Sequence, residues 1–125
     1  VTHCVGMDHV ALPDSASSPE RARQKPGHFA DTGVPALLEM MKRLGTNGNH
    51  QRLIVKLVGG ANVMDPNNTF NIGKRNVLAI KKILWQLGMG AVAEDIGGQI
   101  SRSVVVDVDQ GRVVISSPGK ESWEI

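Results

Sequence analysis

Two side chains near the amino terminus, Cys4 and His9, are the types that make a thiol nucleophile and its base. A histidine accepts the proton of a thiol, and the resulting thiolate attacks a carbonyl carbon. On an extended strand, however, residues five positions apart face opposite sides and lie about 16 Å apart along the axis. A turn at residues 5–6 would be required to bring them together. By residue type alone, the commoner roles are a buried apolar cysteine and a hydrogen-bonded strand histidine.

Two further chemistries are less well supported by the sequence. His3, Cys4 and His9 offer metal-ligand atoms, but no carboxylate is spaced to complete a site, so we expect no bound metal. Gly59 and Gly60 follow a predicted strand but lack the glycine spacing that cradles phosphates, so we expect no nucleotide or other cofactor. The glycine pair is at least equally well explained as a turn that allows close backbone approach.

The composition fits a single compact domain over residues 1–125, with 41% hydrophobic and 21% charged residues. Aromatic residues make up only 3%, which disfavours base-stacking readers of nucleic acid, and a net charge of +2 without basic clusters implies no polyanionic partner. The single cysteine excludes an internal disulfide. No apolar run is long enough to span a bilayer and no export signal is evident, so we expect a cytoplasmic protein without membrane insertion.

Hydrophobic periodicity predicts two helices, at residues 32–44 and 76–87, because apolar side chains recur there every three or four positions. Residues 14–28 are expected to form an exposed loop, and the tail from Pro118 is expected to be loose. Helices among strands with a closing hairpin indicate an α+β domain with helices packed on sheet. The predicted strands are residues 5–12, 53–58, 91–94, 103–107 and 112–116, the last two joined as a hairpin across residues 109–111.

Five short segments, in chain order, carry a resemblance to a known family. They are residues 6–14 (GMDHVALPD), 29–32 (FADT), 56–62 (KLVGGAN), 72–76 (IGKRN) and 93–98 (AEDIGG). The set resembles the CheD family, whose members carry a GxMxHxxLP segment, a YAD-type helix start, a KLxGGAxM segment, an IGxxN segment and an AEDxGG segment. Each segment alone is a weak match, but the five occur together in the family order.

This resemblance implies a fold of mixed, sandwich-like β-sheets with two main helices packed against them, similar to CheD proteins and toxin-type cysteine deamidases. It implies a protein-glutamine amidohydrolase that converts glutamines of methyl-accepting chemoreceptors to glutamate and releases ammonia. In that mechanism a cysteine thiolate attacks the amide carbonyl while a histidine takes and returns the proton. His9 matches the family histidine as general base and acid, and Gly59, Gly60 and Asn62 match loops that border the family cleft.

The family cysteine lies in a GSC-type segment on the strand before the histidine, as does the threonine of the triad. We expect residues 1–125 to form one CheD-like domain that lacks this N-terminal strand. Cys4 stands where the family nucleophile does not, so it is the nucleophile only if it has been recruited. The strand would also be missing from a shortened chain, which we favour, or from a member that has lost catalysis. In the last case the chain is a binding module that docks receptors and a CheC-type phosphatase of CheY.

Overall fold

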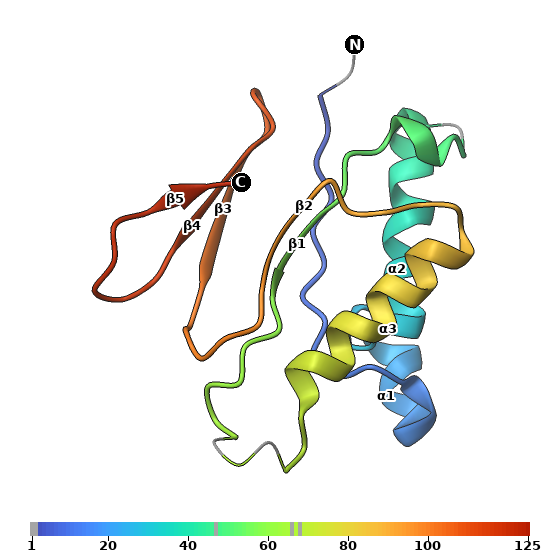
Figure 1. Ribbon diagram of the computed structural model, residues 1–125. Coiled ribbons are helices and arrows are strands. Elements are labelled where there is room, and N and C mark those ends of the chain that lie inside the picture. Colours follow the sequence, from blue (N-terminus) through green and yellow to red (C-terminus); the bar gives the residue numbers. More distant parts are fainter. Residues whose placement is uncertain (1–2, 47, 66, 68) are drawn as a thin grey trace.

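The computed structural model describes residues 3–46, 48–65, 67 and 69–125, and it confirms the expected α+β class (Figure 1). The helices are α1 (Pro19–Gln24), α2 (Ala30–Met41) and α3 (Ile72–Gln86). The strands are β1 (Lys56–Gly59), β2 (Ala93–Ile96), β3 (Ser103–Asp107), β4 (Arg112–Ser116) and β5 (Trp123–Glu124). Short 3-10 helices occupy Ser15–Ser17, Pro26–His28 and His50–Arg52, and a π-helical turn occupies Lys42–Thr46.

The strands form two small sheets. β1 and β2 pair in parallel, from Lys56 opposite Ala93 to Gly59 opposite Ile96. Parallel strands need a crossover connection because they run in the same direction, and α3 lies in that connection. β3, β4 and β5 form an antiparallel sheet in that order. In Figure 1 the parallel pair lies between the helices and the three-stranded sheet, so β1 and β2 connect the two halves of the molecule.

Both predicted helices are confirmed, and each begins earlier than expected. α2 carries Ala30 and Val34 on its buried face, ends at Met41, and is followed by the π-helical turn in which Gly45 has φ of 120°. α3 buries Leu84 and ends before Gly88, whose φ of 71° suits glycine at a helix stop. The two helices pack against each other.

The approach to α3 is organised by one carboxylate. The Asp65 side chain accepts backbone N–H bonds from Thr69 at 2.8 Å, and from Phe70 and Asn71 at 2.9 Å each. The hydrogen bond from Asn71, followed by those from Phe70 and Thr69, lowers the pKa of the Asp65 carboxyl group. The loop that leads from β1 into α3 is therefore held in a defined shape just before the helix begins.

The expected strand at residues 5–12 is wrong. Residues 3–11 run without regular structure, and the segment has a single bridge, between Leu12 and Phe29. An alternating pattern becomes a strand only when a neighbouring strand supplies hydrogen-bond partners. Among the described residues, no strand pairs with this segment. Its last residues bond instead to the backbone that leads into α2.

The expected loop at residues 14–28 is also wrong, because it contains α1 and two 3-10 helices. The Asp14 carboxylate accepts the Ala16 N–H at 2.7 Å, and the Asp31 carboxylate accepts the backbone N–H of Ser15 at 2.9 Å. Ala22 is the buried residue of α1. These short helices depend on capping side chains and on one small apolar contact, which a pattern search for apolar periodicity does not detect.

The remaining strand predictions are largely confirmed. β3, β4 and their hairpin lie at the expected residues, whereas β1 and β2 lie two or three residues further along than predicted. The tail from Pro118 is not loose, because Trp123 and Glu124 form β5 opposite Ile115 and Val114 of β4. That pairing depends on side chains distant in sequence, so local composition gave no indication of it.

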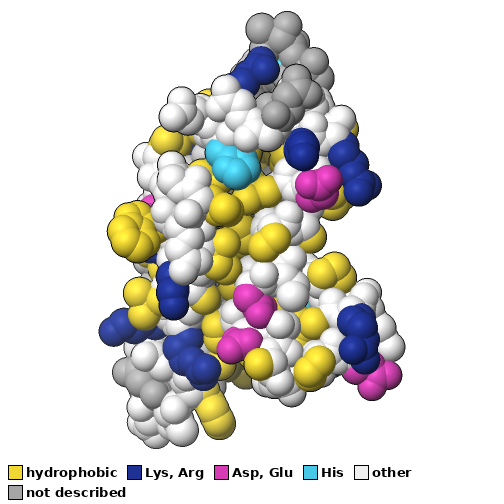
Figure 2. Space-filling view, turned by 90° about the vertical axis from the view of Figure 1, so that its right-hand side faces the viewer, with side chains coloured by type: hydrophobic (Ala, Val, Ile, Leu, Met, Phe, Trp, Pro, Cys, Tyr) yellow, Lys and Arg dark blue, Asp and Glu magenta, His cyan; other side chains and the backbone are white. Residues whose placement is uncertain are grey.

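The core lies where α2 and α3 meet the sheets. Phe29, Ala30 and Ile115 are fully buried, and Leu84 is 4% exposed. Figure 2 shows the helical face, where hydrophobic side chains line a hollow. Other large apolar side chains stay in solvent, among them Met64 and Trp85. Among the described residues, no helix is both long and apolar enough to cross a membrane.

Candidate active site around His9

His9 lies in the extended amino-terminal segment, and its side chain is exposed. The end of this segment is fixed by backbone hydrogen bonds. Ala11 and Leu12 donate to the carbonyl of His28 at 2.9 and 3.0 Å, and Ala30 donates to the carbonyl of Leu12 at 2.9 Å. The start of α2 is thereby joined to the chain three residues after His9.

A second tie comes from α3. The Asn76 side-chain Nδ2 donates to the carbonyl of Ala11 at 3.1 Å, so α3 holds the segment two residues beyond His9. The Asn76 Oδ1 atom is buried and has no hydrogen-bond partner among the described residues. A buried amide with one open acceptor is costly, which indicates that the contact with Ala11 is retained for its geometry.

The segment crosses α2 at close range through glycines. A Cβ atom at Gly6 would lie 2.7 Å from Leu37 Cδ1 and 2.8 Å from Met41 Sδ. Two residues on, the Asp8 carboxyl group lies against Gly27 and Gly33, where added Cβ atoms would be 2.6 and 2.3 Å from its oxygens. The amino-terminal segment therefore rests directly on the α2 backbone, with no space for larger side chains at these positions.

The surroundings of Asp8 differ from those of its neighbour His9. Asp8 is half-buried, and its Oδ2 atom is buried without a hydrogen-bond partner among the described residues. Burial raises the pKa of the Asp8 carboxyl group, while the charge of His9 and the His9 backbone N–H act in the opposite direction. The candidate base thus projects into solvent beside a carboxyl group that projects into the protein.

Cys4 is not brought to His9. Its side chain is half-buried, and residues 3–11 contain no turn or bend that would fold the segment back. Along such a segment, two residues five positions apart are about 16 Å apart. Among the described residues, no three His, Cys, Asp or Glu side chains are grouped so as to hold a metal ion. His3, Cys4 and His9 therefore do not assemble into a metal site in this part of the chain.

The glycine loops of two sequence segments form a shared hollow of about 520 Å³. Asn62 N–H donates to the carbonyl of Gly98, and Gly97 N–H donates to that of Gly59, both at 2.8 Å. Gly60 and Asn62 line the hollow, as predicted for cleft-bordering loops, together with Lys74 of α3. Gly59 is not among the lining residues; its φ is 110° and its carbonyl joins the two loops.

A largely buried ion pair holds these loops from behind. Arg102 Nε donates to Asp95 Oδ1 at 3.0 Å, and its Nη1 donates to the carbonyl of Gly97 at 2.9 Å. The other oxygen of Asp95 accepts a hydrogen bond from the Trp123 indole N–H. The carboxyl end of β2 is thus fixed both to the loop before β3 and to β5.

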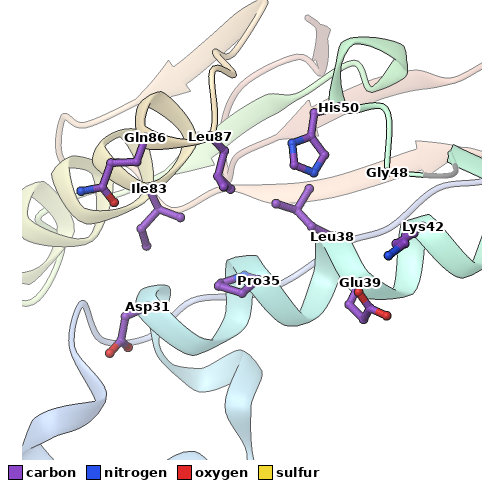
Figure 3. Close-up of a pocket in the computed structure, with 10 residues that line it drawn as sticks. All are labelled: Asp31, Pro35, Leu38, Glu39, Lys42, Gly48, His50, Ile83, Gln86 and Leu87. Atoms are coloured by element: carbon purple, nitrogen blue, oxygen red, sulfur yellow. The ribbon is translucent and has the colours of Figure 1, made fainter.

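A larger hollow of about 690 Å³ lies between α2 and α3 (Figure 3). Leu38, Leu87 and His50 point into it. Asp31, Glu39 and Lys42 place charge on its rim. His9 lines neither this groove nor the glycine-loop hollow, as far as the described residues define them.

Sequence reasoning missed Asp8 and Asn76, which fix the segment that carries His9. One signal was available, because a glycine inside a predicted helix costs about 1 kcal/mol relative to alanine and so implies a close approach. Gly33 occupies such a position in α2. Nothing in the sequence indicates which side chain approaches it.

Comparison with known proteins gives consistent matches. The family model described as CheD chemotactic sensory transduction matches residues 11–117, from two residues after His9 to just beyond β4. A "Probable chemoreceptor glutamine deamidase CheD" of Syntrophotalea carbinolica is 56% identical over 120 residues, which are 96% of this chain and 74% of that protein. The "Chemoreceptor glutamine deamidase CheD" of Thermotoga maritima is 40% identical over 113 residues, 90% of this chain and 68% of that protein.

Proposed function

The chain belongs to the CheD family, and we propose on that basis that it is a chemoreceptor glutamine deamidase acting in the cytoplasm. It hydrolyses the side-chain amide of receptor glutamines to glutamate and releases ammonia. The observation that carries this proposal is the 56% identity with a relative named for that activity, over 96% of the chain. Methyl-accepting chemoreceptors are its protein substrates.

We propose His9 as the general base and acid. The imidazole takes the proton of a cysteine thiol, and the thiolate forms a bond to the amide carbonyl carbon of the glutamine. The same imidazole protonates the departing nitrogen, so ammonia leaves and a thioester remains. Water then loses a proton to His9 and attacks the thioester, which releases glutamate and restores the thiol. The exposure of His9 supports this role, because a receptor side chain can reach it directly.

The glycine-loop hollow is our candidate for substrate contact, through Gly60 and Asn62, with Gly59 shaping the loop. Two features support this assignment. The loops are held by backbone and Arg102 hydrogen bonds, so the hollow keeps its shape without substrate. Helix α3 contacts both places, since Asn76 holds Ala11 near His9 while Gly73 lies against Gly60.

The proposal is tested by incubating the natural-length protein with chemoreceptor fragments and following the mass gain that accompanies loss of an amide nitrogen. We expect His9→Ala to lower the deamidation rate at least about 100-fold, the usual contribution of a general base. His3→Ala is the matched control, since His3 is an exposed histidine on the same segment. An unchanged rate in His9→Ala would exclude His9 as the base.

The identity of the nucleophile is tested separately with Cys4→Ala. Cys4 acts as nucleophile only if residues 5–6 bend enough to bring its sulfur to His9, and no bend is present there. We therefore expect Cys4→Ala to deamidate at the wild-type rate. Complete loss of activity in this variant, with the fold retained, would show that Cys4 has been recruited.

We also propose a CheC-type phosphatase as a second partner, with the groove between α2 and α3 as its docking surface. The groove supports this assignment because it has an apolar floor and a charged rim and contains neither His9 nor the glycine loops. Leu87→Glu should weaken binding of a purified CheC-type protein, while Ile54→Glu, also exposed but outside the groove, should not. Equal affinities of the two variants would exclude this surface.

A further inference from the structure

The Asp8 carboxyl group occupies a slot between two glycines. Gly27 closes one side of the slot, since a Cβ atom there would lie 2.6 Å from Asp8 Oδ1. Gly33 of α2 closes the other side, where a Cβ atom would lie 2.3 Å from Asp8 Oδ2 and 3.1 Å from Gly27 Cα. Real side chains almost never approach to such distances, so the carboxyl group fits only because both positions lack a Cβ atom.

The slot determines where His9 points. In an extended segment successive side chains project to opposite sides, and here Asp8 points into the protein while His9 points to solvent. The Asp8 carboxylate also accepts the backbone N–H of His9. Asn76 holds Ala11 on the other side of His9. The base is therefore fixed by one tie before it and one tie after it.

Simple packing would not require a carboxylate in this place. A buried carboxylate oxygen without a hydrogen-bond donor is destabilising, and Asp8 Oδ2 is such an atom. An apolar side chain of similar size would fill the slot without that penalty, but it could not accept the His9 N–H. The feature that distinguishes aspartate here is its hydrogen bond to the candidate base.

We infer that Asp8 is a positioning residue, whose carboxyl group in the Gly27–Gly33 slot holds His9 in the place it needs for proton transfer. This inference rests on the proposed function, in which His9 is the general base. Asp8 touches neither substrate nor reacting atoms in this role. It acts through the backbone of His9, so its loss should affect the chemical step more than substrate binding.

Three variants test the inference in the natural-length protein. Asp8→Ala should lower kcat by about 10-fold to 100-fold with little change in KM, because a small misplacement of a base slows proton transfer. Asp8→Asn should retain most of the activity, since its amide oxygen can still accept the His9 N–H and its shape fits the slot. Asp8→Leu should fill the slot and preserve stability but behave like Asp8→Ala in kcat. Wild-type kcat in Asp8→Ala or Asp8→Leu would overturn the inference.

The slot itself is tested by a double-mutant cycle that does not depend on activity. Gly33→Ala alone should lower the melting temperature and shift the His9 backbone amide signal in NMR spectra, because the new methyl group meets Asp8. Combined with Asp8→Ala, the same change should be tolerated, because the methyl group then enters vacated space. Gly90→Ala is the control, since nothing lies within 4 Å of its Cβ position.

The two readouts separate the possible failures. If the wild-type protein does not deamidate receptor fragments, the proposed function fails and the positioning role fails with it, even if the cycle shows strong coupling. If the wild-type protein is active but the effects of Asp8→Ala and Gly33→Ala are additive, the slot does not exist in solution and the inference is overturned. Strong coupling together with a selective loss of kcat in Asp8→Ala is the expected result.

Discussion

Asp8 and His9 are sequence neighbours with opposite surroundings. The carboxyl group lies against α2 between two glycines, and the imidazole is exposed. A charged group that leaves water loses hydration, and only part of that loss is recovered from the His9 charge and N–H. The arrangement therefore couples the protonation state of Asp8 to the stability of the folded chain.

This coupling predicts a measurable pH dependence. The pKa of Asp8 is raised above its ordinary value of 3.8, so the folded protein holds this proton more tightly than the unfolded chain. The stabilising contribution is complete below pH 3.8 and is lost as the pH rises through the folded-state pKa. Asp8→Asn cannot titrate, so its free energy of unfolding should gain on that of the wild type across this range in urea titrations. Parallel pH profiles of the two proteins would contradict the prediction.

At this scale the sequence identified the reactive residue but not its support. His9 was predicted from its place in the GMDHVALPD segment, and the structure keeps it exposed on a fixed segment. Asp8 and Asn76 were missed because their contacts are with residues far along the chain, Gly33 and Ala11. Residue types report what chemistry is available, whereas the partners of a side chain are set by tertiary packing.

Close backbone contact also joins elements elsewhere. At the start of α3, a Cβ atom on Gly73 would lie 2.3 Å from the carbonyl oxygen of Gly60 and 2.9 Å from that of Ala61. These neighbours are backbone atoms, which cannot rotate away as a side chain can. Helix α3 and the glycine loop after β1 must therefore move apart if either position gains a side chain.

We predict that Gly73→Ala destabilises the protein by about 1–3 kcal/mol, the usual cost of overpacking, despite the better helix propensity of alanine. The displaced loop should also raise the KM for receptor fragments if the glycine-loop hollow contacts substrate. Chemical denaturation and steady-state kinetics measure the two effects. The control Gly90→Ala should change the free energy of unfolding by no more than about 0.5 kcal/mol.

The success of sequence reasoning differed among the elements for physical reasons. α2 and α3 were predictable because an amphipathic stripe and a terminal glycine are local signals, and the β3–β4 hairpin because its turn is short. The segment before Pro13 alternates like a strand, yet no described strand lies beside it. α1 and β5 form through contacts with Asp31 and with β4, which no local pattern encodes.

Over the whole molecule, the carboxyl-terminal strand is bound to the parallel pair by polar contacts. Asp95 of β2 bonds to both Arg102 and Trp123, and Lys56 Nζ of β1 donates to the carbonyl of Ile125 at 2.7 Å. The Arg102 and Asp95 side chains are only 7% and 21% exposed. This cluster links the three-stranded sheet to the sheet that carries the glycine loops.

Two ion pairs of similar length but different burial provide a matched test. Arg102→Met leaves the Asp95 carboxylate buried without its charge partner, which should cost about 3–5 kcal/mol. Arg112 pairs with Glu124 at 3.0 Å, as Arg102 pairs with Asp95, but its partners are about half exposed, so Arg112→Met should cost far less. Urea unfolding of both variants measures the difference. Equal losses would mean that the Asp95 cluster does not join the two sheets.

The hydrogen bond between Trp123 and Asp95 also gives the molecule an intrinsic optical reporter. The chain contains no tyrosine and two tryptophans, and Trp85 is 79% exposed. Trp85 emission should therefore change little on unfolding, whereas the indole of Trp123 moves from a protein contact beside a carboxylate into water. The fluorescence change of the unmodified protein thus reports release of β5 from β2. It does so at the contact that joins the two sheets, without any added dye.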